Sequence, residues 1–152
     1  MQLTLAILKP DICIHGNRVQ KILSLLRSNG FSCLQSKKKW LTHEESEQFY
    51  AIHKGKFFYK RLTTFMSSGE MIALILEREH AISKWREMLG PTSPYRARQL
   101  QPYSIRALYG ISDTRNVGHG SDCDNTARKE IGFFFSDFDY DGWKVQYARH
   151  IV

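Results

Sequence analysis

The sequence predicts a single α+β domain in which helices cover a small, mostly antiparallel sheet. Strand-like and helical segments are mixed along the chain without the regular rhythm of a parallel βαβ fold, and no internal repeat is present. The chain has 152 residues, 42% of them hydrophobic, which suits one domain with a sizeable core. We expect the domain to span residues 1–136. Residues 137–152 are weakly patterned and should form a tail that packs on the domain or extends from it.

Three segments have the character of β-strands. They cover residues 2–9, 31–41 and 71–76. In the first, Leu3, Leu5 and Ile7 alternate with smaller or polar neighbours, and Pro10 stops the pattern. Lys9 should therefore lie at the carboxyl end of a strand. The second contains three consecutive lysines, and the third is an apolar run that is typical of a central strand.

Five segments have helical spacing of apolar residues. Their stripes are Val19, Ile22, Leu23 and Leu26; Phe49 and Tyr50; Phe58, Leu62, Phe65 and Met66; Ala81, Trp85, Met88 and Leu89; and Ala127, Ile131, Phe134 and Phe135. Thr42 and Glu45 have the spacing of a capping box before the second helix. Asp122 or Asp124 should cap the start of the last helix.

The segment from Gly90 to Gly118 has no convincing periodicity, and we expect a long loop. It holds three of the four prolines and Arg96, Arg98, Arg106 and Arg115. Long loops inside compact domains are usually functional. The sequence therefore predicts a basic, structured loop beside a site.

Composition restricts the functions that the chain could have. No apolar run approaches the roughly 18 residues that cross a bilayer, and the first residues do not resemble a signal peptide, so no membrane partner is expected and the cytoplasm is the default compartment. Cys13, Cys33 and Cys123 are widely spaced and are expected to be free thiols. The net charge of +7 favours a polyanionic partner. Nucleic acid ranks last among such partners, because no RNA-recognition signature of paired aromatic residues is present.

His119 is the first candidate for chemistry, because histidine can act as a nucleophile as well as a base. It lies between Gly118 and Gly120, which leave room for a phosphate to approach. The alternative is an ordinary surface histidine in a glycine-rich turn. Ser121 and Asp122 follow it, but adjacent residues rarely converge as a hydrolase triad must, so we set that interpretation aside.

Glu130 shares the helical stripe of Ala127 and Ile131, so its carboxylate should point toward a buried side of the helix and need a partner there. If that partner is one ring nitrogen of His119, the other nitrogen is free to attack. The alternative is a Glu at the helix edge that reaches solvent or Arg128.

Several cations and neutral donors on expected loops and element ends could hold phosphates. They are Lys9, Arg86, Arg106 and Arg115, with Thr92 and Asn116 as neutral donors. Each alone could be a solvated surface residue. Neither a Gly-x-x-x-x-Gly-Lys nor a Gly-x-Gly-x-x-Gly motif occurs, so side chains would hold the phosphates. No cluster has metal-ligand spacing, which leaves any Mg²⁺ to be carried mainly by the phosphates of a nucleotide.

From about Leu3 to Phe135 the sequence resembles the nucleoside diphosphate kinases. The segments that carry the resemblance are LTLAILKPD, QFYAIHKG, FMSSG, WREMLGPTSP, SIRALYG and TRNVGHGSDCDNTARKEIGFFF, in the family's order and nearly its spacing. The resemblance implies a ferredoxin-like sandwich with a four-stranded sheet. It also implies ping-pong transfer of the terminal phosphate from a nucleoside triphosphate such as ATP to a nucleoside diphosphate, with Mg²⁺. Phe57-Phe58-Tyr59, SDTRN and FFSDF look like the divergent type-6 branch, which keeps a mitochondrial location open.

The resemblance also assigns roles to individual residues. His119 matches the phosphate acceptor, with Glu130 behind it and Tyr50 nearby. Positions that hold the phosphates match Arg86, Thr92, Arg106 and, more weakly, His53. Positions that bind the sugar hydroxyls match Lys9 and Asn116, and the aromatic on which the base stacks matches Phe58. Stacking without hydrogen-bond recognition tolerates any base, which implies broad nucleotide specificity. Phe58 could instead belong to the core, because it lies on an apolar stripe.

Three departures from the family pattern keep a second function open. Gly118 stands where an apolar residue is usual, and Ala107 stands where glycine is usual. The segment 94–105 is about three residues longer than in the common forms, where it helps to build a hexamer, so the hexamer is not carried over. The alternative function is a weakly active or inactive adaptor, with a protein partner or a second copy contacted through the basic loop or the tail.

Overall fold

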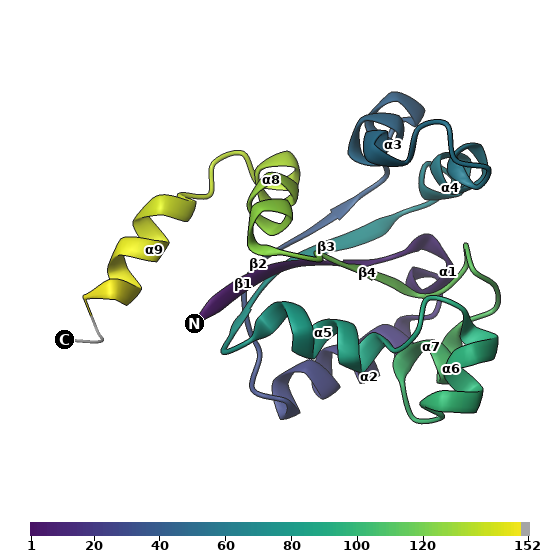
Figure 1. Cartoon of the computed structure of the whole chain (residues 1–152), viewed down its shortest axis with the longest axis horizontal. Helices are drawn as coiled ribbons and strands as arrows, with labels where there is room; N and C mark the ends of the chain where they lie inside the picture. Colours follow the sequence, from purple (N-terminus) through teal and green to yellow (C-terminus); the bar gives the residue numbers. More distant parts are fainter. Residues whose placement is uncertain (150–152) are drawn as a thin grey trace.

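Four strands form one antiparallel sheet with helices on both faces (Figure 1). The structure is a computed structural model that describes residues 1–149, so residues 150–152 of the expected tail lie outside the described part. In chain order the elements are β1 Gln2–Leu8, α1 Pro10–Cys13, α2 Gly16–Ser28, β2 Ser32–Lys39, α3 His43–Phe49, η1 Ala51–His53, α4 Tyr59–Met66, β3 Met71–Arg78, α5 Ala81–Leu89, α6 Pro94–Leu100, α7 Ile105–Tyr109, β4 Gly118–Gly120, α8 Asp124–Phe134 and α9 Tyr140–Ala148. The strand order is β2-β3-β1-β4. The α+β sandwich predicted from the sequence is confirmed.

The central strand β1 is buried on both faces, which explains its nearly continuous apolar sequence. Leu3, Leu5 and Ile7 pack on one face with residues of α4 and α8. Ala6 and Leu8 pack on the opposite face with α2 and α5. Figure 1 shows the same division, with α3, α4 and α8 on one side of the sheet and α2, α5, α6 and α7 on the other. The two cores fix β1, from which the site is built.

At one edge of the sheet, β2 pairs only with β3, and none of its residues is fully buried. Two of its lysines contact helices on the side of the sheet that carries α3 and α8. Lys37 Nζ donates to Phe134 O at 2.6 Å, and Lys39 Nζ lies 2.5 Å from Glu45 Oε2. The strand expected here despite its lysines is therefore present.

The prediction of a long loop between Gly90 and Gly118 is wrong in part, because the segment contains the helices α6 and α7. Ser93 and Ser104 cap them by accepting from backbone N–H groups three residues later. With seven and five residues, these helices are too short to give an apolar period. The three residues of β4 were also missed, for the same reason.

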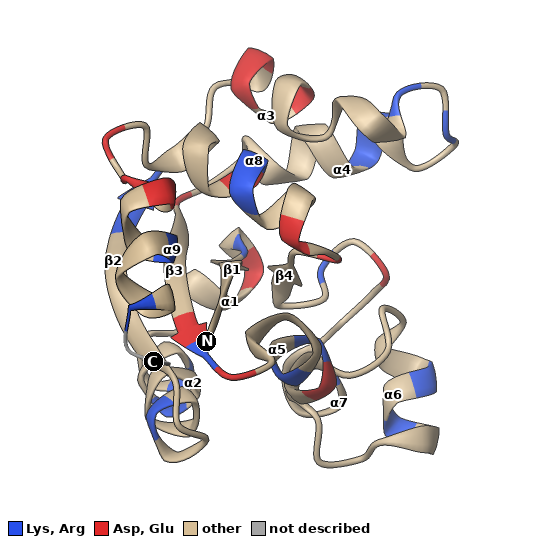
Figure 2. Ribbon diagram, turned by 60° about the vertical axis from the view of Figure 1, so that its left-hand side comes forward, with Lys and Arg blue, Asp and Glu red and all other residues tan. Residues whose placement is uncertain are grey.

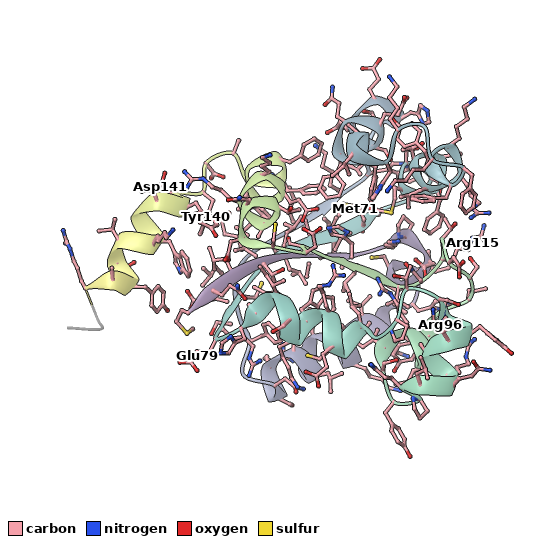
Figure 3. The ribbon with its side chains drawn as sticks, viewed as in Figure 1. Met71, Glu79, Arg96, Arg115, Tyr140 and Asp141 are labelled. Atoms are coloured by element: carbon pink, nitrogen blue, oxygen red, sulfur yellow. The ribbon has the colours of Figure 1, made fainter. Side chains whose placement is uncertain are left out.

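The last two helices also differ from expectation. The residue that caps α8 is Cys123, without a side-chain cap bond, so neither Asp122 nor Asp124 occupies the predicted cap position. The weakly patterned tail contains α9, whose first residues Tyr140 and Asp141 lie beside α8 (Figure 3). No helix within residues 1–149 is long and apolar enough to cross a membrane.

Candidate active site

The candidate nucleophile lies in the middle of the edge strand β4. His119 is opposite Ile7 of β1 in the sheet. Two residues before it, Val117 has a φ of 78°, which is strained for a β-branched side chain. Burial and a hydrogen bond hold Val117 in this conformation, because its side chain is fully enclosed and its N–H donates to Asp11 Oδ2 at 3.0 Å. The entry into β4 is therefore fixed by its surroundings.

A directed chain of hydrogen bonds holds the ring of His119. The backbone N–H of Leu5 donates to Ser121 Oγ at 3.1 Å, and Ser121 Oγ–H donates to Glu130 Oε1 at 2.6 Å. The other carboxylate oxygen, Oε2, lies 2.7 Å from His119 Nε2. Because an ionised carboxylate only accepts, the hydrogen of the imidazole is on Nε2. Nδ1 then carries the lone pair and has no protein partner among the described residues.

Aromatic side chains enclose the same ring. The ring centroid of His119 lies 5.5 Å from that of Phe49 and 6.3 Å from that of Tyr50, both in edge-on geometry. The Tyr50 hydroxyl is buried and has no hydrogen-bond partner within residues 1–149. Burial, followed by the charge of Glu130, raises the pKa of Tyr50, so the phenol stays neutral. The hydroxyl of Tyr50 is therefore an unpaired polar group enclosed beside the candidate nucleophile.

Lys9 follows directly after β1, as predicted. Its side chain is 6% exposed, and its Nζ donates to Asn116 Oδ1 at 2.8 Å. Asn116 Nδ2 in turn donates to Thr92 O at 3.0 Å. Burial and, to a lesser extent, the charge of Arg106 lower the pKa of Lys9 to about 8, although the nearby Asp11 acts in the opposite direction. These contacts bring together three predicted site residues from three separate segments.

Two arginines reach the backbone of β4 from the helices α5 and α7. Arg106 donates from Nε to Asn116 O at 3.1 Å, and from Nη1 and Nη2 to Gly90 O and Gly118 O, both at 2.8 Å. Arg86 Nη1 lies 3.5 Å from the carbonyl of the last β4 residue. Burial, followed by the charge of Arg86, lowers the pKa of Arg106 to about 10, so Arg106 is still cationic at neutral pH.

His53 and Phe58 connect the site to the segment between α3 and α4. The ring of His53 lies 6.3 Å from Tyr50 and 5.3 Å from Phe58. Burial, the charge of Lys56 and the neighbouring His119 lower the pKa of His53. Phe58 is half-buried at the start of α4 and is not among the core residues, so the core alternative for it is not supported. Figure 2 shows basic residues on α4 and on the segment leading into it.

One predicted cation lies apart from the others. Arg115 lines a cavity of about 990 Å³ between α4, α6 and the segment before β4, and its guanidinium lies 5.8 Å from the ring centroid of Phe65 (Figure 3). None of the residues placed around His119 above lines this cavity. Arg61 of α4, which also lines the cavity, donates to Thr114 Oγ1 at 2.9 Å, and the carbonyl of Thr114 lies 3.5 Å from Lys9 Nζ.

Comparisons with known proteins agree with this geometry. The family model described as nucleoside diphosphate kinase matches residues 2–140. The chain is 44% identical to nucleoside diphosphate kinase 6 of Danio rerio over 150 residues, which cover 99% of this chain and 85% of that protein. It is 42% identical to a nucleoside diphosphate kinase of Desulfotalea psychrophila, covering 91% of this chain and 98% of that one.

A solved structure gives the same result. The nucleoside diphosphate kinase of Aquifex aeolicus superimposes with a TM-score of 0.85 at 39% identity, covering 90% of this chain and 96% of that chain. The chain belongs to the nucleoside diphosphate kinase family. The type-6 branch and the ferredoxin-like α+β fold predicted from the sequence are confirmed.

Membership of the nucleoside diphosphate kinase family supports a kinase-type enzyme that transfers phosphate between nucleotides. Members of the family bind nucleotides, generally with Mg²⁺, and form oligomers. Within residues 1–149 no group of three or more His, Cys, Asp or Glu side chains could hold a metal ion. The charged groups nearest the β4 backbone are the cations Arg86 and Arg106, which suit phosphate oxygens. Arg86 and Arg106 would face the phosphates of a nucleotide, and those phosphates would supply the oxygen ligands of a Mg²⁺ ion.

Two of the three departures from the nucleoside diphosphate kinase pattern, Ala107 and Gly118, are accommodated locally. Ala107 lies inside α7 without a positive φ, so glycine is not needed there. At Gly118, an added Cβ would lie 2.8 Å from Leu89 Cδ2, so neighbouring side chains already fill the space of the usual apolar residue.

Sequence reasoning missed two contributors to this nucleoside diphosphate kinase site. Ser121 was considered only as part of a hydrolase triad, whereas it donates to Glu130. Trp85 was assigned only to an apolar stripe, yet its indole N–H donates to His119 O at 2.9 Å. Only the sequence motif around His119 could have drawn attention to Ser121. No local signal marked Trp85.

Proposed function

We propose that this chain transfers the terminal phosphate of a nucleoside triphosphate to a nucleoside diphosphate by a ping-pong mechanism, with His119 as the transient carrier. The observation that supports this most is the hydrogen bond between His119 Nε2 and Glu130 Oε2. It leaves Nδ1 unprotonated and free to attack, and it places a negative charge behind the nitrogen that becomes cationic.

In the first half-reaction, the lone pair of His119 Nδ1 forms a bond to the γ-phosphorus, and the bond from that phosphorus to the β–γ bridging oxygen breaks. The nucleoside diphosphate leaves with that oxygen. In the second half-reaction, a terminal oxygen of another diphosphate attacks the phosphohistidine and displaces Nδ1. Glu130 stabilises the positive charge on the ring between the two steps, and Ser121 keeps the carboxylate in position.

Cations and neutral donors would bind the nucleotide. Arg106 has five N–H donors, and three of them are used on carbonyls, so two remain for phosphate oxygens. Arg86 lies at the other end of β4, and Thr92 and His53 would add weaker phosphate contacts. Mg²⁺ bound to the phosphates would neutralise part of their charge.

Binding of the nucleoside part would rest on three residues. Lys9 and Asn116, which are joined by a 2.8 Å hydrogen bond, would bind the sugar hydroxyls. Phe58 would stack on the base, and because stacking tolerates any base, we expect broad nucleotide specificity. The ring of Tyr50, whose centroid lies 6.3 Å from that of His119, would help to enclose the phosphate acceptor.

An adaptor with weak or no activity is the second candidate function. The surface of α6 and α7 favours it, because several large apolar side chains there are exposed. They are Tyr95, Leu100, Tyr103, Leu108 and Ile111. Such a surface would suit a protein partner or a second copy of the chain.

Incubation with γ-³²P-labelled ATP separates the two functions. We expect an acid-labile, alkali-stable label on the protein that transfers to added GDP. His119→Ala should abolish the label, whereas His15→Ala, at an exposed histidine, should leave it unchanged. A folded wild-type protein that binds ATP but takes no label would refute the kinase and favour the adaptor.

A further inference from the structure

A tryptophan on α5 contacts the strand that carries the nucleophile. Trp85 is fully buried, and its Nε1–H donates to His119 O at 2.9 Å. The carbonyls on either side of His119 in β4 accept from Arg106 at 2.8 Å and from Arg86 at 3.5 Å. Each of the three β4 carbonyls therefore has a side-chain donor. Trp85 is the neutral donor between the two arginines that we propose for phosphate binding.

The glycines that flank His119 are matched to this indole. A Cβ added at Gly120 would lie 2.7 Å from Trp85 Cδ1 and 3.1 Å from its Nε1. A Cβ added at Gly118 would lie 3.6 Å from Trp85 Cζ2 and 2.8 Å from Leu89 Cδ2. The edge of the indole that carries the N–H therefore lies along β4, from Gly120 to Gly118. A side chain at position 120 would push the indole away from the His119 carbonyl, whereas a Cβ at position 118 would be in ordinary contact with it.

The strand needs such support because it is short and pairs on one side only. β4 has three residues and contacts only β1 in the sheet. It also follows Val117, whose positive φ must be held by its surroundings. Glu130 holds the ring of His119 but not its backbone. A shift of the backbone would move Nδ1 even if the ring kept its hydrogen bond.

We infer that Trp85 is a positioning residue for phosphate transfer, which fixes the His119 backbone so that Nδ1 is aligned with the incoming phosphorus. The inference rests on the proposed function. Trp85 does not touch the reacting atoms. Its contribution is geometric, and small displacements of a nucleophile reduce rates by large factors.

Removal of the indole donor tests the inference. Trp85→Phe should slow single-turnover phosphorylation of His119 by ATP about tenfold or more, while the Kd for ADP changes less than about twofold. The matched control is Trp40→Phe, which also removes an indole donor to a backbone carbonyl, that of Ser67 at 2.8 Å. The control should keep the wild-type rate. An unchanged rate in folded Trp85→Phe would overturn the inference.

Because phenylalanine also leaves a cavity, a second variant separates the hydrogen bond from packing. At position 85, 3-benzothienylalanine keeps the shape of the indole and replaces its N–H with sulfur. We expect this protein to be as slow as Trp85→Phe. If it reacts at the wild-type rate, Trp85 acts through packing alone, and the positioning hydrogen bond is refuted.

A third measurement does not depend on activity. Amide hydrogen exchange of the β4 backbone, measured without nucleotide, should be faster in the benzothienylalanine protein than in the wild type, because the strand loses the donor to the His119 carbonyl. Unchanged exchange there would overturn the inference even if the wild-type protein proved inactive. Absence of phosphohistidine in the wild type, by contrast, would refute only the proposed function.

Discussion

Glu130→Gln removes one negative charge beside His119, and it replaces the carboxylate oxygen that accepts from Ser121 Oγ–H with an amide nitrogen. The amide oxygen of glutamine can still accept from Nε2–H, so the hydrogen bond is weakened but kept. In the wild type, Glu130 Oε2 lies 2.7 Å from that nitrogen, and the side chains of Glu130 and His119 are only 13% and 22% exposed. Water therefore screens this charge poorly, and its loss should be felt when the ring becomes cationic during attack.

The expected magnitude follows from this geometry. Hydrogen bonds to charged groups contribute about 1.5–3 kcal/mol, roughly twice the value of neutral ones. Losing the charged part should raise the barrier by about half of that, about 0.8–1.5 kcal/mol, which makes phosphorylation of His119 about 4- to 13-fold slower. The affinity for ADP should change little, because Glu130 faces the ring and not the nucleotide.

Rapid-quench measurement of phosphohistidine formation from γ-³²P-labelled ATP tests this prediction. The matched control is Glu77→Gln. Glu77 is also a buried carboxylate, and it accepts a hydrogen bond from Trp143 at the end of β3 that is far from the site. The control should react at the wild-type rate. If Glu130→Gln reacts within about threefold of the wild type, or loses affinity instead of rate, the electrostatic role given to Glu130 is wrong.

Three further predictions concern stability. Tyr50→Phe should keep or raise the melting temperature, since the buried hydroxyl makes no hydrogen bond within residues 1–149; a drop of more than a few degrees would contradict this. Lys9 has a folded-state pKa of about 8, below its unfolded value, so between pH 8 and 9.5 the unfolded state binds more protons and stability rises with pH. Urea unfolding at pH 7 and 9.5 should show the wild type gaining about 2 kcal/mol relative to Lys9→Met; a difference that does not change with pH would refute the shifted pKa. Gly118→Ala should lose about 1–3 kcal/mol in the same assay, because its Cβ would collide with Leu89; a neutral result would show that Leu89 moves aside freely.

The elements that the sequence predicted are those whose patterns are long enough to be periodic. β1 and β3 are apolar runs buried on both faces, and α2, α5 and α8 have apolar stripes of two or more turns. The short elements α6, α7 and β4 were not predicted. They are stabilised by serine caps and by tertiary contacts such as those of Arg106, which local patterns do not contain.

The candidate site divides in a similar way. His119 and Glu130 were proposed from local features, and their 2.7 Å contact agrees with that pairing. Tyr50, His53 and Phe58 could be assigned only by resemblance, because they come from a distant segment and meet His119 through the packing of α3 and α4 on the sheet. No sequence pattern could have predicted which three carbonyls accept hydrogen bonds from Arg106.

The contacts of Arg106 make its guanidinium part of the scaffold before any nucleotide arrives. Three of its N–H groups are used on carbonyls from the segments that precede and form β4 and from the end of α5, so its position does not depend on a ligand. A preorganised cation loses little conformational freedom when phosphate binds. Nucleotide entry should then involve little rearrangement at this end of the site, and free and bound forms should superimpose closely around β4.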